Sequence, residues 1–413
     1  MTAPRSRPDG VSRSESDGVS PSGTDTRRLH AWAYLSRVAE PPAAGVARLV
    51  DDVGVEEAAA AIRSRTVPPA HRGVLRTTAA RCETDCAADD LALLDRLGGR
   101  LVTPDDDEWP GWALHALQTA DTAARGGPPL ALWVRGPVCL ADVADDGVAV
   151  VGSRAATAYG TRMASTVAAG AVERGRAVVS GGACGIDGAA HRRALADGGS
   201  TVAVLACGLD IDYPTDHRAL FAEIARTGAV VSEYAPGTTA ARHRFLARNR
   251  LVVALSAAVV VVEAGRRSGA NNTAAWARIV GRPLGAVPGP ATSAMSVGCH
   301  ALIADGYAHL VDGAAAVERL VAPDGGDDSA NPRTAVDDLD PVVARVREAI
   351  PATGRASVAE IAFSAGVDAS TTRSALATLD MHGLVDGDGA GWALSRTRPA
   401  RTPDGGDRRP RLF

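Results

Sequence analysis

The feature that most constrains this chain is a regular alternation between residues 147 and 313. Short, continuously apolar runs, such as 148–151, 201–206 and 257–262, are separated by stretches in which apolar residues recur at helical spacing. Strands that are apolar at every position are buried on both faces, as in a parallel sheet covered by helices. The alternation therefore predicts an α/β fold with a Rossmann-like, doubly wound, mostly parallel sheet, whose ligands bind at the carboxyl ends of the strands.

Other segments flank this α/β domain, which we expect to occupy residues 98–321. Apolar residues at helical spacing predict an N-terminal helical domain at 27–97, and three helical stretches followed by a short hairpin at 341–395 are typical of a C-terminal winged-helix domain. Segments rich in Gly, Ser, Pro and charged residues are expected to be disordered or flexible. They are a tail at 1–26, a linker at 322–340 and a basic tail at 396–413.

The composition limits the kind of site and its location. The 413 residues carry a net charge of −4 and all 44 basic residues are arginine, so anion binding requires a local cluster of arginines. No apolar run reaches the ~18 residues of a membrane span, and the polar N-terminus does not look like a signal peptide. We therefore expect a cytoplasmic protein without membrane contact. Cys82 and Cys86 lack the further ligands that zinc requires, so no metal is expected.

Two loops that follow predicted strands could bind an anion. Their glycines let backbone N–H groups approach a phosphate, and each loop leads into a helix N-terminus, which carries partial positive charge. The G-x-G-x-x-G fingerprint and the acidic residue that would hold a ribose are both missing, so we expect no dinucleotide and no other cofactor. The residues of these loops that we expect to contact phosphate are Gly152, Ser153, Arg154, Ser180, Gly181, Gly182 and Gly185.

A third segment, 242–250, holds four arginines around one phenylalanine, and no acidic residue occurs between Glu233 and Glu263. Guanidinium groups can neutralise phosphates, and an exposed ring can stack on a base. The alternative is a solvated arginine face with the phenylalanine in the core. A fourth loop, 263–273, places a serine and a glycine at another helix N-terminus. The expected contacts in these segments are Arg242, Arg244, Phe245, Arg248, Asn249, Arg250, Ser268 and Gly269.

The same loops contain no Ser/His/Asp, Cys/His or metal-binding cluster, so we expect a binding site without catalytic residues. Asp187 and His191 could form an acid–base pair, but capping of the following helix already accounts for Asp187. Two other functions remain open. A nucleotide phosphohydrolase would need a carboxylate in the groove, for which Glu263 is the candidate. A duplex-binding regulator would use the winged helix, whose recognition stretch has only Arg373 as a basic residue.

The motifs, taken in order, resemble those of the DNA-processing protein A (DprA/Smf) family. This resemblance implies a homodimeric protein without catalytic activity that binds single-stranded DNA. It also implies protection of incoming DNA and loading of the RecA recombinase during natural transformation and recombination. The matching motifs are GSR…YG at 152–160, SGGACGIDGAAH at 180–191, VLACGLDIDYP at 204–214, SEYAPGT at 232–238, FLARNRLVVALS at 245–256, VVEAGRRSGANNTA at 261–274 and VPGP at 287–290.

The resemblance also assigns positions. Gly182 and Cys184 stand where the family often has a leucine and an arginine, which removes one phosphate contact, and Leu246 stands where proline is frequent. The residues that the resemblance implies for the DNA groove are Arg154, Gly181, Gly185, Arg248 and Arg250, with Arg242 and Phe245 just upstream.

Overall fold

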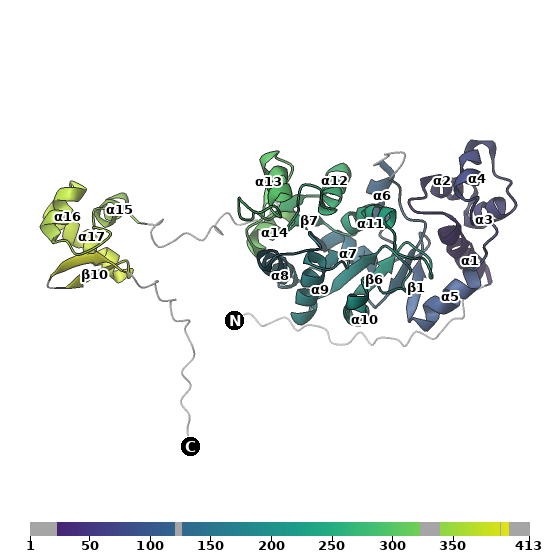
Figure 1. Cartoon of the computed structure of the whole chain (residues 1–413), viewed down its shortest axis with the longest axis horizontal. Helices are drawn as coiled ribbons and strands as arrows, with labels where there is room; N and C mark the ends of the chain where they lie inside the picture. The colour runs from purple at the N-terminus through teal and green to yellow at the C-terminus, as the bar shows by residue number, and fades with distance from the viewer. Residues whose placement is uncertain (1–22, 120–125, 323–338, 389, 396–413) are drawn as a thin grey trace, which may run out of the picture. The chain divides into compact units, whose positions relative to one another are not determined.

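The apolar runs form one central sheet, which belongs to the first of two compact units in this computed structural model (Figure 1). The first unit lies within residues 1–326 and the second within 327–413. The structure describes residues 23–119, 126–322, 339–388 and 390–395. The basic tail expected at 396–413 lies outside the described residues, as do most of the segments 1–26 and 322–340.

The sheet has nine strands in the order β1-β2-β6-β5-β4-β3-β7-β8-β9. β2 pairs antiparallel with β1 and β6, and all other neighbouring strands pair in parallel. The strands are β1 (Gly99–Val102), β2 (Leu132–Arg135), β3 (Val148–Val151), β4 (Val178–Ser180), β5 (Thr201–Leu205), β6 (Ala229–Ser232), β7 (Ala258–Val261), β8 (Leu284–Ala286) and β9 (His309–Leu310). The expected α/β fold with a mostly parallel sheet is thereby confirmed.

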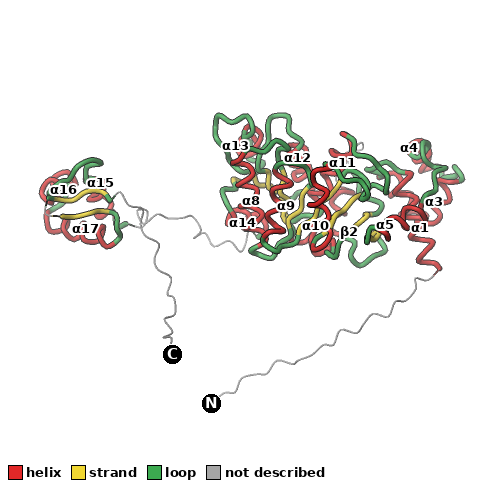
Figure 2. Tube along the Cα trace, turned by 60° about the horizontal axis from the view of Figure 1, so that its bottom comes forward, coloured by secondary structure: helices red, strands yellow, loops and turns green. Residues whose placement is uncertain are grey.

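Both faces of the sheet are covered by helices, which explains the continuously apolar strands (Figure 2). In β3, Val148 and Val150 join the core on one face, while Ala149 and Val151 join the core on the other. The helices of the first face are α8 (Ala158–Val172), α9 (Ile186–Ala196) and α14 (Ala314–Val321). Those of the second face are α6 (Gly111–Thr119), α7 (Leu140–Asp146), α11 (Arg242–Ala254), α12 (Ala270–Val280) and α13 (Val297–Ala304).

The strand order reverses at β3. From there the chain builds β4, β5 and β6 on one side and then returns through α11 to place β7, β8 and β9 on the other side. Connections at such a reversal leave in opposite directions, so the carboxyl ends of the two central strands are left uncovered. The loops after β3 and β7 border this opening, which is where a ligand of a doubly wound sheet binds.

The N-terminal helices pack against the antiparallel end of the sheet. Their core continues into the sheet through Trp133 of β2 and Leu205 of β5, and it includes Phe221 of α10 (Arg218–Thr227). They therefore extend the first unit. These helices are α1 (Gly23–Val38), α2 (Ala44–Val53), α3 (Val55–Arg63), α4 (Arg72–Thr77) and α5 (Ala87–Arg96).

The second unit contains three helices followed by a two-stranded antiparallel hairpin, the order that the sequence predicts. Local signals set its boundaries. Ser357 and Glu360 form a capping box at the start of the second helix, and the Asp368 side chain caps the third. The elements are α15 (Pro341–Glu348), α16 (Val358–Ala365), α17 (Ala369–Met381), β10 (Val385–Asp388) and β11 (Gly391–Leu394).

Some kinds of site are not found in the described part of the chain. None of its helices is long and apolar enough to cross a membrane. None of its His, Cys, Asp and Glu side chains gather in groups of three or more that could hold a metal ion. All six cysteines are free, including Cys82 and Cys86.

Candidate functional site

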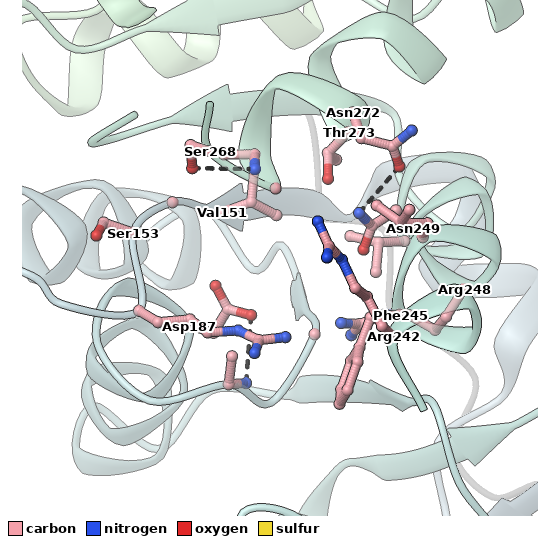
Figure 3. A pocket seen from close by; sticks show the side chains of 18 of the residues that line it. Val151, Ser153, Asp187, Arg242, Phe245, Arg248, Asn249, Ser268, Asn272 and Thr273 are labelled. Atoms are coloured by element: carbon pink, nitrogen blue, oxygen red, sulfur yellow. Dashed lines mark hydrogen bonds between the residues drawn. The ribbon is translucent and has the colours of Figure 1, made fainter. Parts of the chain in front are cut away.

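A pocket of about 820 Å³ opens at the carboxyl end of β3, where the strand order reverses (Figure 3). Its walls come from the loops after β3, β4, β5 and β7, from α11 and from the first turn of α12. The parallel sheet thus brings the four predicted segments together. The predicted site residues that line the pocket are Gly152, Ser153, Arg154, Gly181, Arg242, Phe245, Arg248, Asn249, Ser268 and Gly269. Those that do not line it are Ser180, Gly182, Gly185, Arg244 and Arg250.

Two glycines make close packing of the pocket wall feasible. Gly185 has a φ of +82°, and a Cβ there would lie 2.3 Å from the carbonyl oxygen of Ser153. A Cβ on Gly181 would lie 2.1 Å from Nη1 of Arg248. The glycine loop therefore shapes the site partly by leaving room for a guanidinium group.

Arg248 is the most deeply placed cation of the pocket, with only 5% of its surface exposed. Its Nη1 donates to the carbonyl oxygen of Val204 at 2.5 Å, whereas its buried Nε has no hydrogen-bond partner among the described residues. Burial lowers the pKa of Arg248 from its usual value, and attraction to Asp187 opposes that change. A buried guanidinium with an unused donor is a site that favours an anionic ligand.

The structure corrects the expected role of Asp187. Its side chain makes no capping bond to α9, and instead its Oδ2 accepts from the backbone N–H of Ala183 at 3.3 Å. Burial raises the pKa of Asp187, against the attraction of Arg248. His191 is fully buried, contacts the hydroxyl of Thr201 at 2.7 Å and does not line the pocket, so the two residues do not form an acid–base pair there.

Phe245 lies at the pocket and not in the core. Its ring is half-buried and packs against Tyr213, with 5.3 Å between the ring centroids. The guanidinium of Arg154 lies 4.6 Å from the centre of the same ring. Sequence reasoning missed Tyr213, which stands in a loop without a cluster of arginines, and also Asn272, which lines the pocket from the first turn of α12.

The structure does not support the expected contact between Arg250 and phosphate. Its side chain is completely buried, and its two terminal nitrogens donate to both carboxylate oxygens of Glu233 at 2.8 and 2.6 Å. Nε donates to the carbonyl oxygen of Gly127 at 2.9 Å. No surface of Arg250 is left to meet a phosphate. Its side chain holds α11 against the end of β6 and is not a candidate DNA contact.

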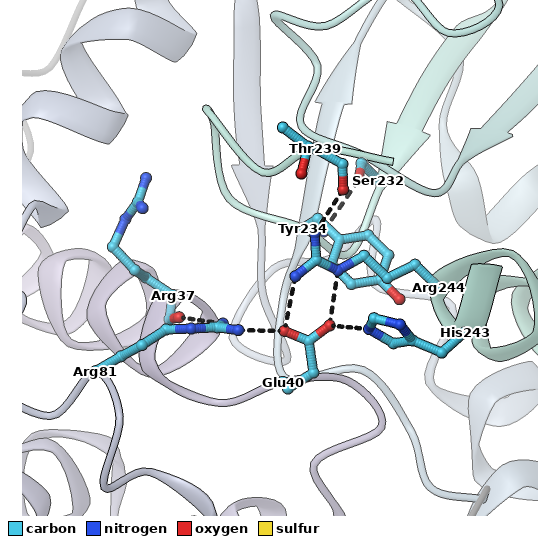
Figure 4. A network of polar contacts seen from close by, with 8 residues as sticks. All are labelled: Arg37, Glu40, Arg81, Ser232, Tyr234, Thr239, His243 and Arg244. Atoms are coloured by element: carbon cyan, nitrogen blue, oxygen red, sulfur yellow. Dashed lines mark hydrogen bonds and ion pairs between the residues drawn. The ribbon is translucent and has the colours of Figure 1, made fainter. Parts of the chain in front are cut away.

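Arg244 also has a carboxylate partner (Figure 4). Glu40, in the loop between α1 and α2, accepts hydrogen bonds from Arg244 at 2.7 Å, from His243 at 3.1 Å and from Arg81. Burial acts to raise the pKa of Glu40, but the hydrogen bonds from these three residues outweigh it and hold the pKa at about 2. Arg244 is therefore neutralised by the N-terminal helical region and lies outside the pocket wall.

The fold and the site together define a Rossmann-like α/β protein with a pocket lined by arginine and glycine at the reversal of its sheet. Comparison with known proteins identifies the family of this chain. The family model described as DNA recombination-mediator protein A matches residues 100–321, about half of the chain, and the chain belongs to this family. The resemblance seen in the motifs is confirmed.

Relatives include proteins named DprA. The putative DNA processing protein DprA of Mycobacterium tuberculosis is 52% identical over 370 residues, which cover 89% of this chain and 94% of the relative. The DNA processing protein DprA of Streptococcus pneumoniae is 38% identical over 208 residues, which cover 50% of this chain and 70% of the relative. The X-ray structure of DprA from S. pneumoniae superposes with a TM-score of 0.56 at 29% identity, covering 72% of this chain and 96% of that one.

The buried pair predicts that Arg250→Ala destabilises the first unit. The substitution leaves the Glu233 carboxylate buried without its partner, which is expected to lower the free energy of unfolding by about 3–5 kcal/mol. Urea denaturation followed by circular dichroism measures this change. Arg242→Ala, on the exposed side of the same helix, is the control and should have little effect. Equal stability of the two variants would contradict the structural role of Arg250.

The Glu40 network predicts a pH dependence. The pKa of Glu40 is about 2 in the folded chain and 4.5 without the network, so its contribution to stability is complete above pH ~4.5 and is lost as the pH falls toward 2. Glu40→Gln lacks this contribution. The difference in free energy of unfolding between the wild type and this variant should therefore shrink over that interval. Glu83→Gln, at an exposed position, is the control. A difference that stays constant with pH would argue against the network.

Proposed function

We propose that this protein binds single-stranded DNA in the pocket at β3 and delivers the strand to a RecA recombinase without catalysing a reaction. The observation that carries the proposal is the gathering of Arg154, Arg242 and Arg248 in one pocket, where Asp187 is the only acid among the described residues that line it. Phosphates are held by such guanidinium groups and by the backbone N–H groups of glycine loops. The candidate contacts are Gly152, Ser153, Arg154, Gly181, Arg242, Phe245, Arg248, Asn249, Ser268 and Gly269.

The aromatic pair favours a nucleic acid over a simple phosphate. Tyr213 is 44% exposed, and Phe245 next to it is half-buried, so that both rings retain surface at the pocket. Stacking of a base on an aromatic ring contributes about 1–3 kcal/mol to the free energy of binding, whichever base it is. An unpaired strand can turn its bases onto these rings, whereas a duplex keeps its bases stacked on one another.

The phosphohydrolase alternative is disfavoured by the position of Glu263. This carboxylate is buried and accepts hydrogen bonds from the backbone N–H of Thr157 at 3.0 Å and from its hydroxyl at 2.6 Å. It does not line the pocket. Its oxygens are engaged in holding the loop before α8. Asp187 is also buried, and its Oδ2 accepts from the backbone N–H of Ala183, so neither acid is placed to activate a water molecule.

The second unit is proposed to be a winged-helix module that contacts a protein partner. Between residues 339 and 395 it carries seven acidic residues and four arginines. Its third helix, at the recognition position of a winged helix, has Arg373 as its one basic residue. A reader of the DNA major groove needs several basic or amide side chains on that helix. The charge therefore argues against a duplex-binding regulator.

The proposed role includes homodimer formation, protection of incoming DNA and loading of RecA in transformation and recombination. Support for this part comes from membership of the DNA recombination-mediator protein A family and from the length shared with the M. tuberculosis relative. RecA loading needs its own experiment, because binding of a strand does not by itself imply its delivery.

The DNA site predicts that Arg154→Ala combined with Arg242→Ala weakens binding of an unstructured oligonucleotide. Two lost phosphate contacts should reduce the slope of log affinity against log salt by about 1.4. A fluorescence anisotropy titration at several salt concentrations measures the slope. Arg226→Ala removes an exposed arginine of α10 outside the pocket wall and should leave the slope unchanged. An unchanged slope in the double variant would contradict the binding of DNA in the pocket.

The mediator role predicts faster RecA filament formation on DNA coated with a single-strand-binding protein when this protein is added. The Arg154→Ala, Arg242→Ala variant should show a smaller effect, because it holds the strand more weakly. RecA ATP hydrolysis reports the filament, and release of phosphate or free base from nucleotides without RecA tests for hydrolase activity. Binding of the oligonucleotide without any effect on RecA would restrict the function to strand binding.

A further inference from the structure

We propose that Asn249 and Asn272 form a reader of the Watson–Crick edge of one base, so that the pocket accepts only unpaired bases. This inference rests on the proposed binding of single-stranded DNA and deepens it. It assigns the selectivity for single strands to hydrogen bonds at the base, in addition to the phosphate contacts and the stacking.

The two amides lie side by side on the pocket wall. Asn249 belongs to α11 and Asn272 to the first turn of α12, and both line the pocket (Figure 3). Nδ2 of Asn249 donates to Oδ1 of Asn272 at 3.1 Å. The bond joins residues of two helices and fixes the amides next to each other.

Their remaining polar groups form a donor and an acceptor. Each amide has one oxygen acceptor and two N–H donors. Within the described parts of the chain, Oδ1 of Asn249 and Nδ2 of Asn272 have no hydrogen-bond partner. Neither side chain is fully buried. The pair therefore presents an unused acceptor and an unused donor at the pocket, without a bond within the chain that must first be broken.

The spacing of Asn249 and Phe245 brings a base and this pair together. Residues four apart on a helix lie on the same face, about 5–6 Å apart at their Cβ atoms. A base stacked on the Phe245 ring thus extends its edge toward the amide one turn further along α11. For thymine, N3–H would donate to Oδ1 of Asn249 and O4 would accept from Nδ2 of Asn272.

The Watson–Crick edge of a base is not accessible in a duplex. Each base carries neighbouring donors and acceptors on its Watson–Crick edge, and in a duplex the opposite base occupies them. Rotation of both amides by 180° exchanges donor and acceptor, so the same pair can serve several bases. The pair is therefore expected to select unpaired bases while discriminating weakly among the four.

The test uses an oligonucleotide of twelve thymidines and the same strand with N3-methylthymine at every position. The methyl group blocks the Watson–Crick edge and leaves the phosphates and the stacking face in place. Wild type should bind the methylated strand roughly tenfold more weakly, as expected for the loss of a bidentate contact to a base. Asn249→Ala with Asn272→Ala should bind both strands equally, at about the affinity of wild type for the methylated strand.

Controls separate this role from a structural bond between two helices. Asn271→Ala changes the neighbouring amide, which donates to backbone carbonyl groups of Gly265 and Arg266 and does not line the pocket, so it should keep the preference. Phe245→Ala should weaken binding of both strands. Asn272→Asp, which replaces the donor with an acceptor, is the conservative alternative if the double variant unfolds, and it too should lose the preference.

The outcomes are distinct. Equal binding of the two strands by wild type overturns the reader, and so does a preference that survives in the double variant and in Asn272→Asp. A reduced melting temperature with an unchanged preference would show that the amide bond is purely structural, which also overturns the proposal. Absence of binding to either strand contradicts the proposed DNA binding itself, and the reader with it.

Discussion

The site depends on how α11 is held against the sheet. Arg250 and Glu233 form a completely buried ion pair with both carboxylate oxygens engaged, and this pair joins the helix to the end of β6. Removing two charges from water is unfavourable, so a pair of this kind persists only where its geometry is complete. The same helix carries Phe245, Arg248 and Asn249 into the pocket. Its position therefore determines where the ring, the deep cation and the amide lie relative to the glycine loops.

The fold could be predicted because a sheet that is buried on both faces requires strands that are apolar at every position. Strands such as β3 alternate their side chains between two cores, so every position must be apolar. Parallel pairing then brings the loops after β3, β4 and β7 to one edge, and this placed ten of the predicted residues around one pocket. Local patterns were sufficient here because each loop is positioned by the strand immediately before it.

The individual roles of the arginines could not be predicted in the same way. The segment 242–250 has no internal acid, but Arg250 pairs with Glu233 seventeen positions earlier, and Arg244 pairs with Glu40, 204 positions away. A run of charges in sequence does not state which charges remain accessible, because the neutralising carboxylates come from other elements. Tyr213 and Asn272 were missed for a related reason: their importance comes from neighbours across the pocket, Phe245 and Asn249.

The balance of charge in the pocket also bears on the proposed mediator role. Arg244 and Arg250 are paired with the carboxylates of Glu40 and Glu233, so that Arg242 and Arg248 are the cations of the segment 242–250 that line the pocket. A protein that only stores DNA gains from the strongest possible attraction to phosphate, whereas one that passes the strand to a recombinase must also release it. A pocket that adds stacking and base-edge contacts to a partly neutralised set of arginines can bind an unpaired strand selectively and still give it up.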